Sequence, residues 1–437
     1  MKTIDAEAVV VGSGPGGATV ARELSLGGKK VVLLEKGKRH PITSSRINSY
    51  RMYDKFAVFS RSEEGVIIDR AITVGGCSVV FSGNSFNPPG WLQEEMGLDL
   101  EATADEIKEE IGIKPFSEEF TRPWVGTKRL REAASDLKLD LKPQEKFIRE
   151  DLCRNGCDGC MTGCRNNAKW TAREWVDNAV EHGATLVPKA DVQEVIIEAG
   201  KAVGVRARTP EGMLKVRADK VVVAAGGVGT AILLQRSGIE SAGGNFYIDP
   251  MNVLWGMMDK PYNEKSEMTF AYATNDLADS KGYIIGNVSC KGAWLTQLFR
   301  ARTAFRAIMA TGRWNRMIGM FTKIADSAEG RVEADGRMKK PFNQEDMRKA
   351  AEATQLARDI MIKAGVKPET ILVAENLGGH PGGTAAVGRV VDKDLAVKGV
   401  ANLYVCDASV FPRSPGRPPT LMILALARKF GRELLSR

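Results

Sequence analysis

The strongest constraint on the fold is a glycine-rich turn near the N-terminus, set between an apolar strand and a helix. Residues 6–11 (AEAVVV) are expected to form a buried strand, and ATVARELSLGG after the turn has a helical pattern. Gly12, Gly14 and Gly17 give the spacing G-x-G-x-x-G. The first glycine permits a tight turn, the second lets backbone approach a pyrophosphate, and the third lets helix and strand pack closely. The pattern predicts a dinucleotide site with its phosphates at the helix N-terminus.

An acidic residue at the end of the next strand narrows the choice of dinucleotide. KKVVLLEKG indicates a second buried strand that ends at Glu35, which is placed to accept hydrogen bonds from ribose hydroxyls. The acid favours a ribose with a free 2′-hydroxyl, and therefore FAD or NAD rather than NADP. Further along lie the closely spaced short strands ATLVP, DVQEVII, AVGVRAR, MLKVRA and KVVVAAGG. Such a meander before a buried return strand is unlike a plain NAD domain.

The remaining composition excludes several classes of protein. A formal charge of +8 over 437 residues is too dilute for nucleic-acid binding, and no basic run with interleaved aromatics accompanies it. No charged N-terminal region followed by a hydrophobic stretch indicates a secretory signal, and no run of at least 18 apolar residues could span a membrane. The sequence therefore predicts a cytoplasmic enzyme.

Four of the seven cysteines lie close together in the sequence. They have the spacing C-x3-C-x2-C-x3-C, with glycines between them, and they are Cys153, Cys157, Cys160 and Cys164. Four thiols in one loop that can fold back on itself are typical of a soft metal centre. Structural zinc usually uses two cysteine pairs separated by a longer stretch. The spacing therefore favours an iron–sulfur cluster, with zinc and redox disulfides as the alternatives.

Three segments far apart in the chain share a further pattern. They are GGCSVVFSG (75–83), AAGGVGTAILLQRSGI (224–239) and GGHPGGTAAVGRVVDKDLAVKGVANLYVCDASVFP (378–412). Together with the N-terminal turn they resemble the glucose–methanol–choline (GMC) oxidoreductase family. The resemblance covers residues 5–36, 72–83, 168–239 and 375–430. Phe81 is a departure, since many family members have asparagine there.

That resemblance implies FAD as the dinucleotide and assigns roles to individual residues. The first segment lines the flavin, and the Asp-Ala-Ser of the third reaches the ribityl chain and the diphosphate. The predicted cofactor contacts, besides those of the N-terminal turn and Glu35, are Gly75, Gly76, Ser78, Val192, Asp407 and Ala408. The resemblance also places the catalytic histidine of the family at His380.

The residues themselves support His380 as the base. It lies in the glycine-rich turn NLGGHPGG, and an imidazole with a pKa near 6.5 suits removal of a hydroxyl proton as hydride leaves the same carbon. The family usually adds a second His or Asn in the turn before the last helix, where this chain has Arg417. Arginine stays charged and cannot be a base. We therefore expect Arg417 to stabilise an alkoxide or bind an anionic substrate group, or to be a surface residue.

Some members of the family carry a cysteine-rich segment at the same point, which implies a cluster that takes electrons from the flavin. A 4Fe-4S cluster is favoured over 3Fe-4S, and which of the four cysteines are ligands stays open. A cluster implies a dehydrogenase with a protein or quinone acceptor. The stretch 292–321 adds a basic amphipathic pattern. It favours an ordinary core helix, with a substrate lid or a peripheral contact at the inner face of an anionic membrane as alternatives.

The predicted fold class is α/β, a Rossmann-type FAD-binding domain with a β-meander, interleaved with a smaller α+β substrate domain and a Cys-rich insertion. The predicted boundaries are 1–90, 168–245 and 385–437 for the FAD domain, 91–167 for the helical and Cys-rich segment, and 246–384 for the substrate domain. The predicted reaction is hydride transfer from the CH–OH group of a small alcohol-type substrate to FAD, with electrons leaving through the cluster. The alternatives are a reductase of C=C or C=O bonds, for example in a lipid, and a non-catalytic electron-transfer flavoprotein.

Overall fold

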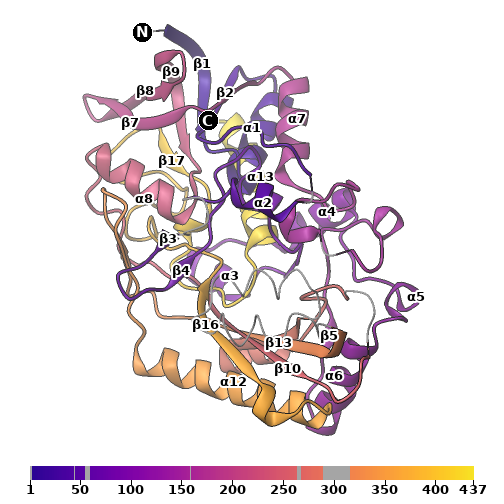
Figure 1. Cartoon of the computed structure of the whole chain (residues 1–437). Coiled ribbons are helices and arrows are strands. Elements are labelled where there is room, and N and C mark those ends of the chain that lie inside the picture. Colours follow the sequence, from indigo (N-terminus) through magenta and orange to yellow (C-terminus); the bar gives the residue numbers. More distant parts are fainter. Residues whose placement is uncertain (1, 44, 55–59, 158, 263–266, 289–314) are drawn as a thin grey trace.

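Two β-sheets, each with its own covering helices, organise the chain (Figure 1). The computed structural model describes residues 2–43, 45–54, 60–157, 159–262, 267–288 and 315–437. The first sheet is built from the N-terminus, residues 185–223 and a short strand near the C-terminus. The second sheet takes its strands mainly from the middle of the chain. The chain therefore crosses repeatedly between the two sheets.

The first sheet has the strand order β6-β2-β1-β9-β8-β7, with β17 also paired to β9. Strands β6, β2, β1, β9 and β17 run parallel, whereas β7, β8 and β9 form an antiparallel meander. The strands are β1 (Lys2–Val11), β2 (Val31–Glu35), β6 (Thr185–Pro188), β7 (Asp191–Glu198), β8 (Lys201–Thr209), β9 (Gly212–Val223) and β17 (Leu403–Val405). The long strand β9 is the predicted return strand. The predicted meander and Rossmann-type sheet are confirmed.

Helices α1 (Pro15–Leu26), α7 (Ala172–Glu181) and α13 (Thr420–Leu435) pack together beside this sheet, and α8 (Gly226–Arg236) follows β9 (Figure 1). Helix α1 begins at Pro15, within the glycine-rich turn, and ends at Leu26, which agrees with the helical pattern of ATVARELSLGG. No side chain caps its N-terminus, and its first turn contains no acidic residue. The first backbone N–H groups of α1 are therefore available to an anionic ligand.

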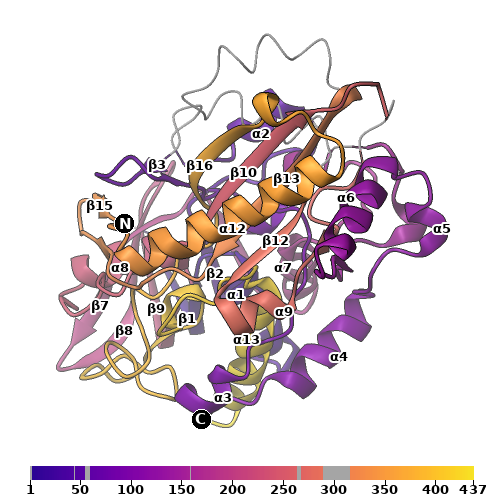
Figure 2. The same ribbon diagram turned by 90° about the horizontal axis from the view of Figure 1, so that it is seen from below.

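The second sheet has the order β3-β4-β16-β10-β13-β12-β11-β5. Its strands are β3 (Ser60–Arg61), β4 (Ile67–Ile68), β5 (Lys142–Pro143), β10 (Pro250–Met257), β11 (Tyr272–Ala273), β12 (Tyr283–Val288), β13 (Met317–Ile324) and β16 (Leu372–Gly378). The long helix α12 (Gln344–Lys363) crosses strands β10, β12 and β13 on one face (Figure 2). Strands β3 and β4 belong to this sheet, although they lie within residues 1–90, which were assigned to the FAD domain. The domain boundaries stay a prediction.

Local signals set the ends of two helices. Asn343 and Asp346 form a capping box at the start of α12, in which each side chain accepts from the other residue's backbone N–H. The sequence AKWTAREWVDNAVEHG has a helical pattern from residue 168, but helix α7 begins later, at Ala172. Trp170 N–H donates to the Phe147 carbonyl and Lys169 bridges to Ile148, so this short segment is extended. Pairing with a neighbouring chain segment overrides its helical pattern.

The remaining elements are short or lie at the periphery. They are α2 (Arg46–Tyr50), α3 (Trp91–Met96), α4 (Glu101–Ile111), α5 (Glu118–Thr121), α6 (Val125–Asp136), α9 (Asp276–Lys281), the hairpin β14 (Arg331–Val332) and β15 (Met338–Lys339), and the 3₁₀ turns η1 (Gly76–Val79), η2 (Glu150–Leu152), η3 (Cys160–Thr162), η5 (Pro368–Thr370) and η6 (Ala408–Val410). Among the helices of the described segments, none is long and apolar enough to cross a bilayer. Most of the basic amphipathic stretch lies outside the described residues, and its last residues belong to the buried strand β13.

Candidate FAD and catalytic site

The three glycines of the N-terminal turn have three different surroundings. Gly12 has φ +101°, and a Cβ there would lie 2.3 Å from the Ala224 carbonyl oxygen. A Cβ on Gly17 would lie 1.8 Å from the Gly12 carbonyl oxygen. Around Gly14, by contrast, a Cβ would meet no described atom within 4 Å. Gly12 and Gly17 are therefore required for packing, whereas Gly14 borders open space at the N-terminus of α1, where a pyrophosphate would bind.

Glu35 closes the same site from the end of β2. Its carboxylate accepts from Ser13 N–H (3.0 Å), Ser13 O–H (2.7 Å) and Gly37 N–H (2.7 Å). Burial raises the pKa of Glu35, and these donors oppose that rise. The Ala190 N–H donates to the Glu35 backbone carbonyl, and Val192 follows two residues later. The predicted contact of Val192 with the cofactor stays a prediction.

The glycine pair at residues 75 and 76 packs directly on the phosphate turn. Gly75 N–H donates to the Ser13 hydroxyl (3.1 Å), and a Cβ on Gly76 would lie 2.8 Å from Gly14 Cα. Both glycines have positive φ, which few other residues adopt. Ser78 is buried, and its hydroxyl donates to the Gly75 carbonyl and accepts from the Ala172 N–H. Its hydroxyl therefore holds the shape of this loop.

The Asp-Ala pair predicted near the C-terminus meets the same turn from the other side. A Cβ on Gly16 would lie 2.1 Å from the Cys406 carbonyl oxygen, so α1 is pressed against the end of β17. The Asp407 carboxylate accepts from Gly226 N–H (2.7 Å), Thr230 O–H (2.6 Å) and Ser409 N–H (2.8 Å). Asp407 thereby ties the start of α8 to the turn after β17.

These segments together fit FAD. They supply an uncapped helix N-terminus, an open glycine position and a buried carboxylate at the end of the second strand. The Ser409 hydroxyl is buried and has no hydrogen-bond partner among the described residues. A buried hydroxyl without a hydrogen-bond partner destabilises the folded state. Bound FAD would supply the missing partner. The four segments were all predicted from sequence, and the structure brings them together.

Strand pairing places His380 opposite a buried carboxylate that the sequence did not identify. Strands β10 and β16 pair so that Pro250 lies across from Gly378. As a result Asp249, directly before β10, lies beside His380, directly after Gly379. The Asp249 Oδ2 to His380 Nδ1 distance is 3.2 Å. The His380 turn is also bound to the cofactor side, because Gly383 N–H donates to the Ala408 carbonyl.

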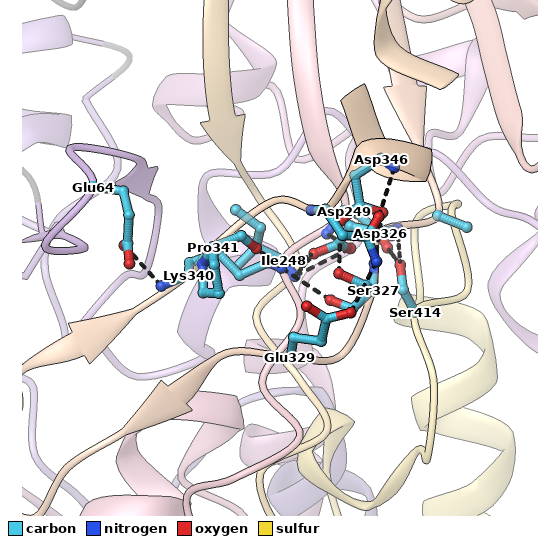
Figure 3. Close-up of polar contacts among 12 residues, drawn as sticks. Glu64, Ile248, Asp249, Asp326, Ser327, Glu329, Lys340, Pro341, Asp346 and Ser414 are labelled. Atoms are coloured by element: carbon cyan, nitrogen blue, oxygen red, sulfur yellow. Dashed lines mark hydrogen bonds and ion pairs between the residues drawn. The ribbon is translucent and has the colours of Figure 1, made fainter. Parts of the chain in front are cut away.

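Asp249 is held in place by hydrogen bonds and by an ion pair next to it (Figure 3). Its Oδ1 accepts from the Ser414 hydroxyl and from Gly416 N–H. The Asp326 carboxylate accepts from the Asp249 N–H (2.9 Å) and pairs with the Lys340 ammonium (3.1 Å), and both charged side chains are fully buried. Asp249 is itself fully buried, with φ +50°. The backbone that presents Asp249 to His380 is therefore rigidly held.

The electrostatic surroundings keep His380 neutral at ordinary pH. Burial and the nearby Lys323 ammonium lower the pKa of His380, and the hydrogen bond to Asp249 opposes this. The side chain is 23% exposed, so one edge of the ring remains accessible. With Asp249 accepting from Nδ1–H, Nε2 is the nitrogen that can take a proton. Neither Asp249 nor Lys323 belongs to a recognisable motif, and only strand pairing reveals them.

Arg417 lies in the turn that holds Asp249, but its guanidinium points elsewhere. The neighbouring Gly416 N–H donates to Asp249, whereas Arg417 Nη2 pairs with Asp279 of α9. The side chain is 13% exposed, and its Nε has no partner among the described residues. The structure therefore brings the His380 and Arg417 turns together through Asp249. The expected role of the Arg417 side chain stays a prediction.

The four predicted cysteine ligands lie near one another, and three of them pack against the core beneath the second sheet. Cys157 Sγ accepts from the Gly159 N–H at 3.4 Å. Burial raises the pKa of Cys160, while the Lys169 and Lys146 ammonium groups favour its thiolate. Burial and the three other cysteines raise the pKa of Cys153 to about 12. Within the described segments, no group of three or more His, Cys, Asp or Glu residues is arranged to hold a single metal ion.

Comparison with known proteins agrees with this geometry. Residues 6–251 match the N-terminal model of the GMC oxidoreductases, and residues 326–427 match the C-terminal model. An uncharacterized GMC-type oxidoreductase of Mycobacterium tuberculosis is 29% identical over 97% of this chain and 74% of its own length. A long-chain-alcohol oxidase of Arabidopsis thaliana is 23% identical over 97% of this chain and 67% of its own.

Solved structures share the fold at low sequence identity. The pyridoxine 4-oxidase from Mesorbium loti superposes with a TM-score of 0.73 and 18% identity, covering 99% of both chains. The formate oxidase of Aspergillus oryzae gives a TM-score of 0.71 with 15% identity, over 100% of this chain and 99% of its own. The predicted fold class is therefore confirmed. The chain belongs to the GMC oxidoreductase family, whose members are FAD-dependent enzymes acting on CH–OH groups.

Proposed function

We propose that this chain is a dehydrogenase that oxidises a CH–OH group with His380 as the base. The observation that supports it most directly is the contact between His380 and the buried Asp249. The Asp249 carboxylate fixes the ring and stabilises the imidazolium that forms when Nε2 takes the hydroxyl proton. Bound FAD would accept the hydride from the same carbon. The oxidation removes one proton, which His380 takes, and one hydride, which the flavin would take. Together these account for two electrons and two protons.

The cysteine segment supplies the second half of the proposal. We infer that Cys153, Cys157, Cys160 and Cys164 hold an iron–sulfur cluster, with 4Fe-4S favoured over 3Fe-4S. A cluster holds its cysteines farther apart than a single ion does, and the N–H donor to Cys157 is of the kind that tunes cluster potentials. Such a cluster would pass electrons singly to an acceptor protein or a quinone. A peripheral contact with a membrane would bring the enzyme to a quinone.

The substrate class is proposed from relatives. Several curated relatives are long-chain-alcohol oxidases of Arabidopsis thaliana. We therefore propose an alcohol-type substrate. Primary alcohols of increasing chain length are the first candidates to test. Aliphatic chain length changes binding by about 0.8 kcal/mol per buried methylene, so a matched series reveals whether the pocket is apolar.

The experiment is anaerobic purification followed by substrate addition. We expect a flavin spectrum, stoichiometric iron and acid-labile sulfide, and bleaching of the flavin by an alcohol without added reductant. Joint replacement of Cys157, Cys160 and Cys164 by serine should remove iron and sulfide. Zinc without iron in the wild type would defeat the cluster. Bleaching only with a low-potential donor would favour the reductase instead, and no bleaching by any donor would favour a non-catalytic protein.

A further inference from the structure

A buried lysine connects the cysteine segment to residues 73–81, the cofactor loop. Gly75 and Gly76 of this loop pack on the glycine-rich turn of residues 12–17. Lys169 is 3% exposed, and its ammonium donates to the carbonyl oxygens of Cys160 (2.6 Å), Val79 (2.9 Å) and Phe81 (2.8 Å). Val79 ends η1, the turn that begins at Gly76. One ammonium group therefore contacts a cysteine of the proposed centre and the end of the cofactor loop.

The same short segment holds that loop at further points. The Ala172 N–H donates to the Ser78 hydroxyl, and the Arg173 guanidinium donates to the Val74 carbonyl (2.8 Å). Arg173 also donates to the Thr73 hydroxyl (3.1 Å). Residues 169–173, directly after the cysteine segment, thus bind almost the whole loop from residue 73 to residue 81. This segment therefore fixes the position of Cys160 relative to the loop.

The charge of Lys169 is not balanced by any carboxylate. Within the segments that the structure describes, its three donors all bind neutral carbonyl groups, and no Asp or Glu lies at ion-pair distance. The Phe81 ring lies 4.9 Å from the ammonium and offers only a weak cation–π contact. A buried ammonium without an anionic partner costs several kcal/mol. The cysteine segment, whose Cys160 carbonyl accepts from this ammonium, holds the groups that would become anionic as thiolate ligands of a cluster.

We propose that Lys169 is a positioning residue that couples the cysteine centre to the flavin: its charge offsets the thiolates and favours the reduced cluster, and its three hydrogen bonds fix the distance to the cofactor loop. This inference rests on the proposed iron–sulfur function. A nearby positive charge makes addition of an electron easier, because reduction makes the cluster more negative. Lys169 therefore directs electrons from the flavin side toward the cysteines.

The test compares Lys169→Met, which keeps length but removes charge, with Lys169→Arg, which keeps charge. Lys128→Met, on the exposed face of α6, is the control for loss of a surface charge. Anaerobic protein is titrated with reductant and redox dyes, and the cluster is followed by electron paramagnetic resonance. At the potential that half-reduces the wild-type cluster, Lys169→Met should lower the reduced-to-oxidised ratio on the order of 10- to 100-fold. Lys169→Arg and Lys128→Met should change it little.

Each outcome decides the matter. An unchanged ratio in Lys169→Met, with cluster and FAD retained, overturns the inference. If Lys169→Met loses iron while Lys169→Arg keeps it, the charge is required and the inference stands. If both variants lose iron, the lysine serves packing alone and the inference falls. A wild-type protein without iron or labile sulfide would instead refute the proposed cluster itself, and that measurement is independent of the variants.

Discussion

Replacing Asp249 by asparagine tests whether the buried carboxylate makes His380 a base. In the wild type, Asp249 accepts from His380 Nδ1, from Ser414 and from the Gly416 N–H. An asparagine can still accept from Ser414 and Gly416, but its amide then turns an N–H toward His380. The ring would respond with the other tautomer, placing its proton on Nε2. That nitrogen could no longer take the substrate proton.

The expected magnitude follows from the geometry. The carboxylate oxygen lies 3.2 Å from Nδ1, so the carboxylate and a protonated ring have charges about 4 Å apart, worth about 4 kcal/mol at an effective dielectric constant near 20. That corresponds to about 10³-fold in rate. The buried Lys323 ammonium, which bonds the Asp249 carbonyl, reduces the benefit. We expect Asp249→Asn to slow flavin reduction by about 10²- to 10³-fold.

The assay is anaerobic stopped-flow reduction of bound FAD by the alcohol that bleaches the wild type fastest. Ser414→Ala is the matched control, since it removes one hydrogen bond to Asp249 but leaves its charge, and should cost about tenfold or less. Residual activity of Asp249→Asn should also show its acid limb at lower pH, because the hydrogen bond that raises the His380 pKa is lost. A rate within about threefold of wild type, with an unmoved acid limb, would refute the reasoning.

Two further predictions concern the cofactor turn and the buried network. Gly14→Val should give folded protein without FAD, because the valine side chain enters the open space where the pyrophosphate would bind. Gly17→Ala should fail to fold, because its Cβ would lie 1.8 Å from the Gly12 carbonyl oxygen. Flavin content and circular dichroism distinguish the two variants. Burial raises the pKa of Asp326 from 3.8 to about 6, so the folded state binds more protons and loses stability as pH rises across that range. Thermal unfolding against pH should show this decline, and Asp326→Asn should flatten it.

The cofactor half of the molecule could be predicted from sequence because its signals are local. Gly12 and Gly17 are required by contacts within one turn of chain, and Glu35 ends a strand whose apolar run is continuous. Such constraints act between residues that are near in sequence. Asp407 was predicted as a cofactor contact from the family resemblance, and in the structure its carboxylate accepts from the Gly226 N–H, far away in sequence.

The half of the molecule that carries His380 could not be predicted to the same depth. Asp249 lies 131 positions from His380, and only the β10–β16 register brings them together. A one-residue shift of that register would turn the neighbouring side chains to the other face of the sheet. The sequence around Lys169 has a helical pattern, whereas pairing with Ile148 makes this residue extended, and its ammonium donates to the Cys160 carbonyl. Long-range strand pairing therefore decides the residues that sequence patterns missed.

The same long-range contacts identify which cation acts on His380. The sequence predicted Arg417 as a cation that stabilises an alkoxide or binds an anionic substrate group, or as a surface residue. In the structure the Arg417 guanidinium pairs with Asp279, and Lys323 is the cation that lowers the pKa of His380. The turn that carries Arg417 contributes its backbone instead, through Gly416 N–H on Asp249. This turn therefore contacts Asp249 through the Gly416 N–H and the Ser414 hydroxyl, and not through the Arg417 guanidinium.

Lys323→Met and Arg417→Ala should consequently have different pH profiles. Only the neutral ring can accept the substrate proton, so the rate rises as pH passes the pKa of His380. Loss of the Lys323 charge raises that pKa and moves the acid limb to higher pH. Loss of Arg417 should leave the limb in place and weaken binding of anionic substrates alone, as loss of a guanidinium contact would. An upward shift in Arg417→Ala with none in Lys323→Met would reverse this assignment and restore the arginine to the proton-transfer site.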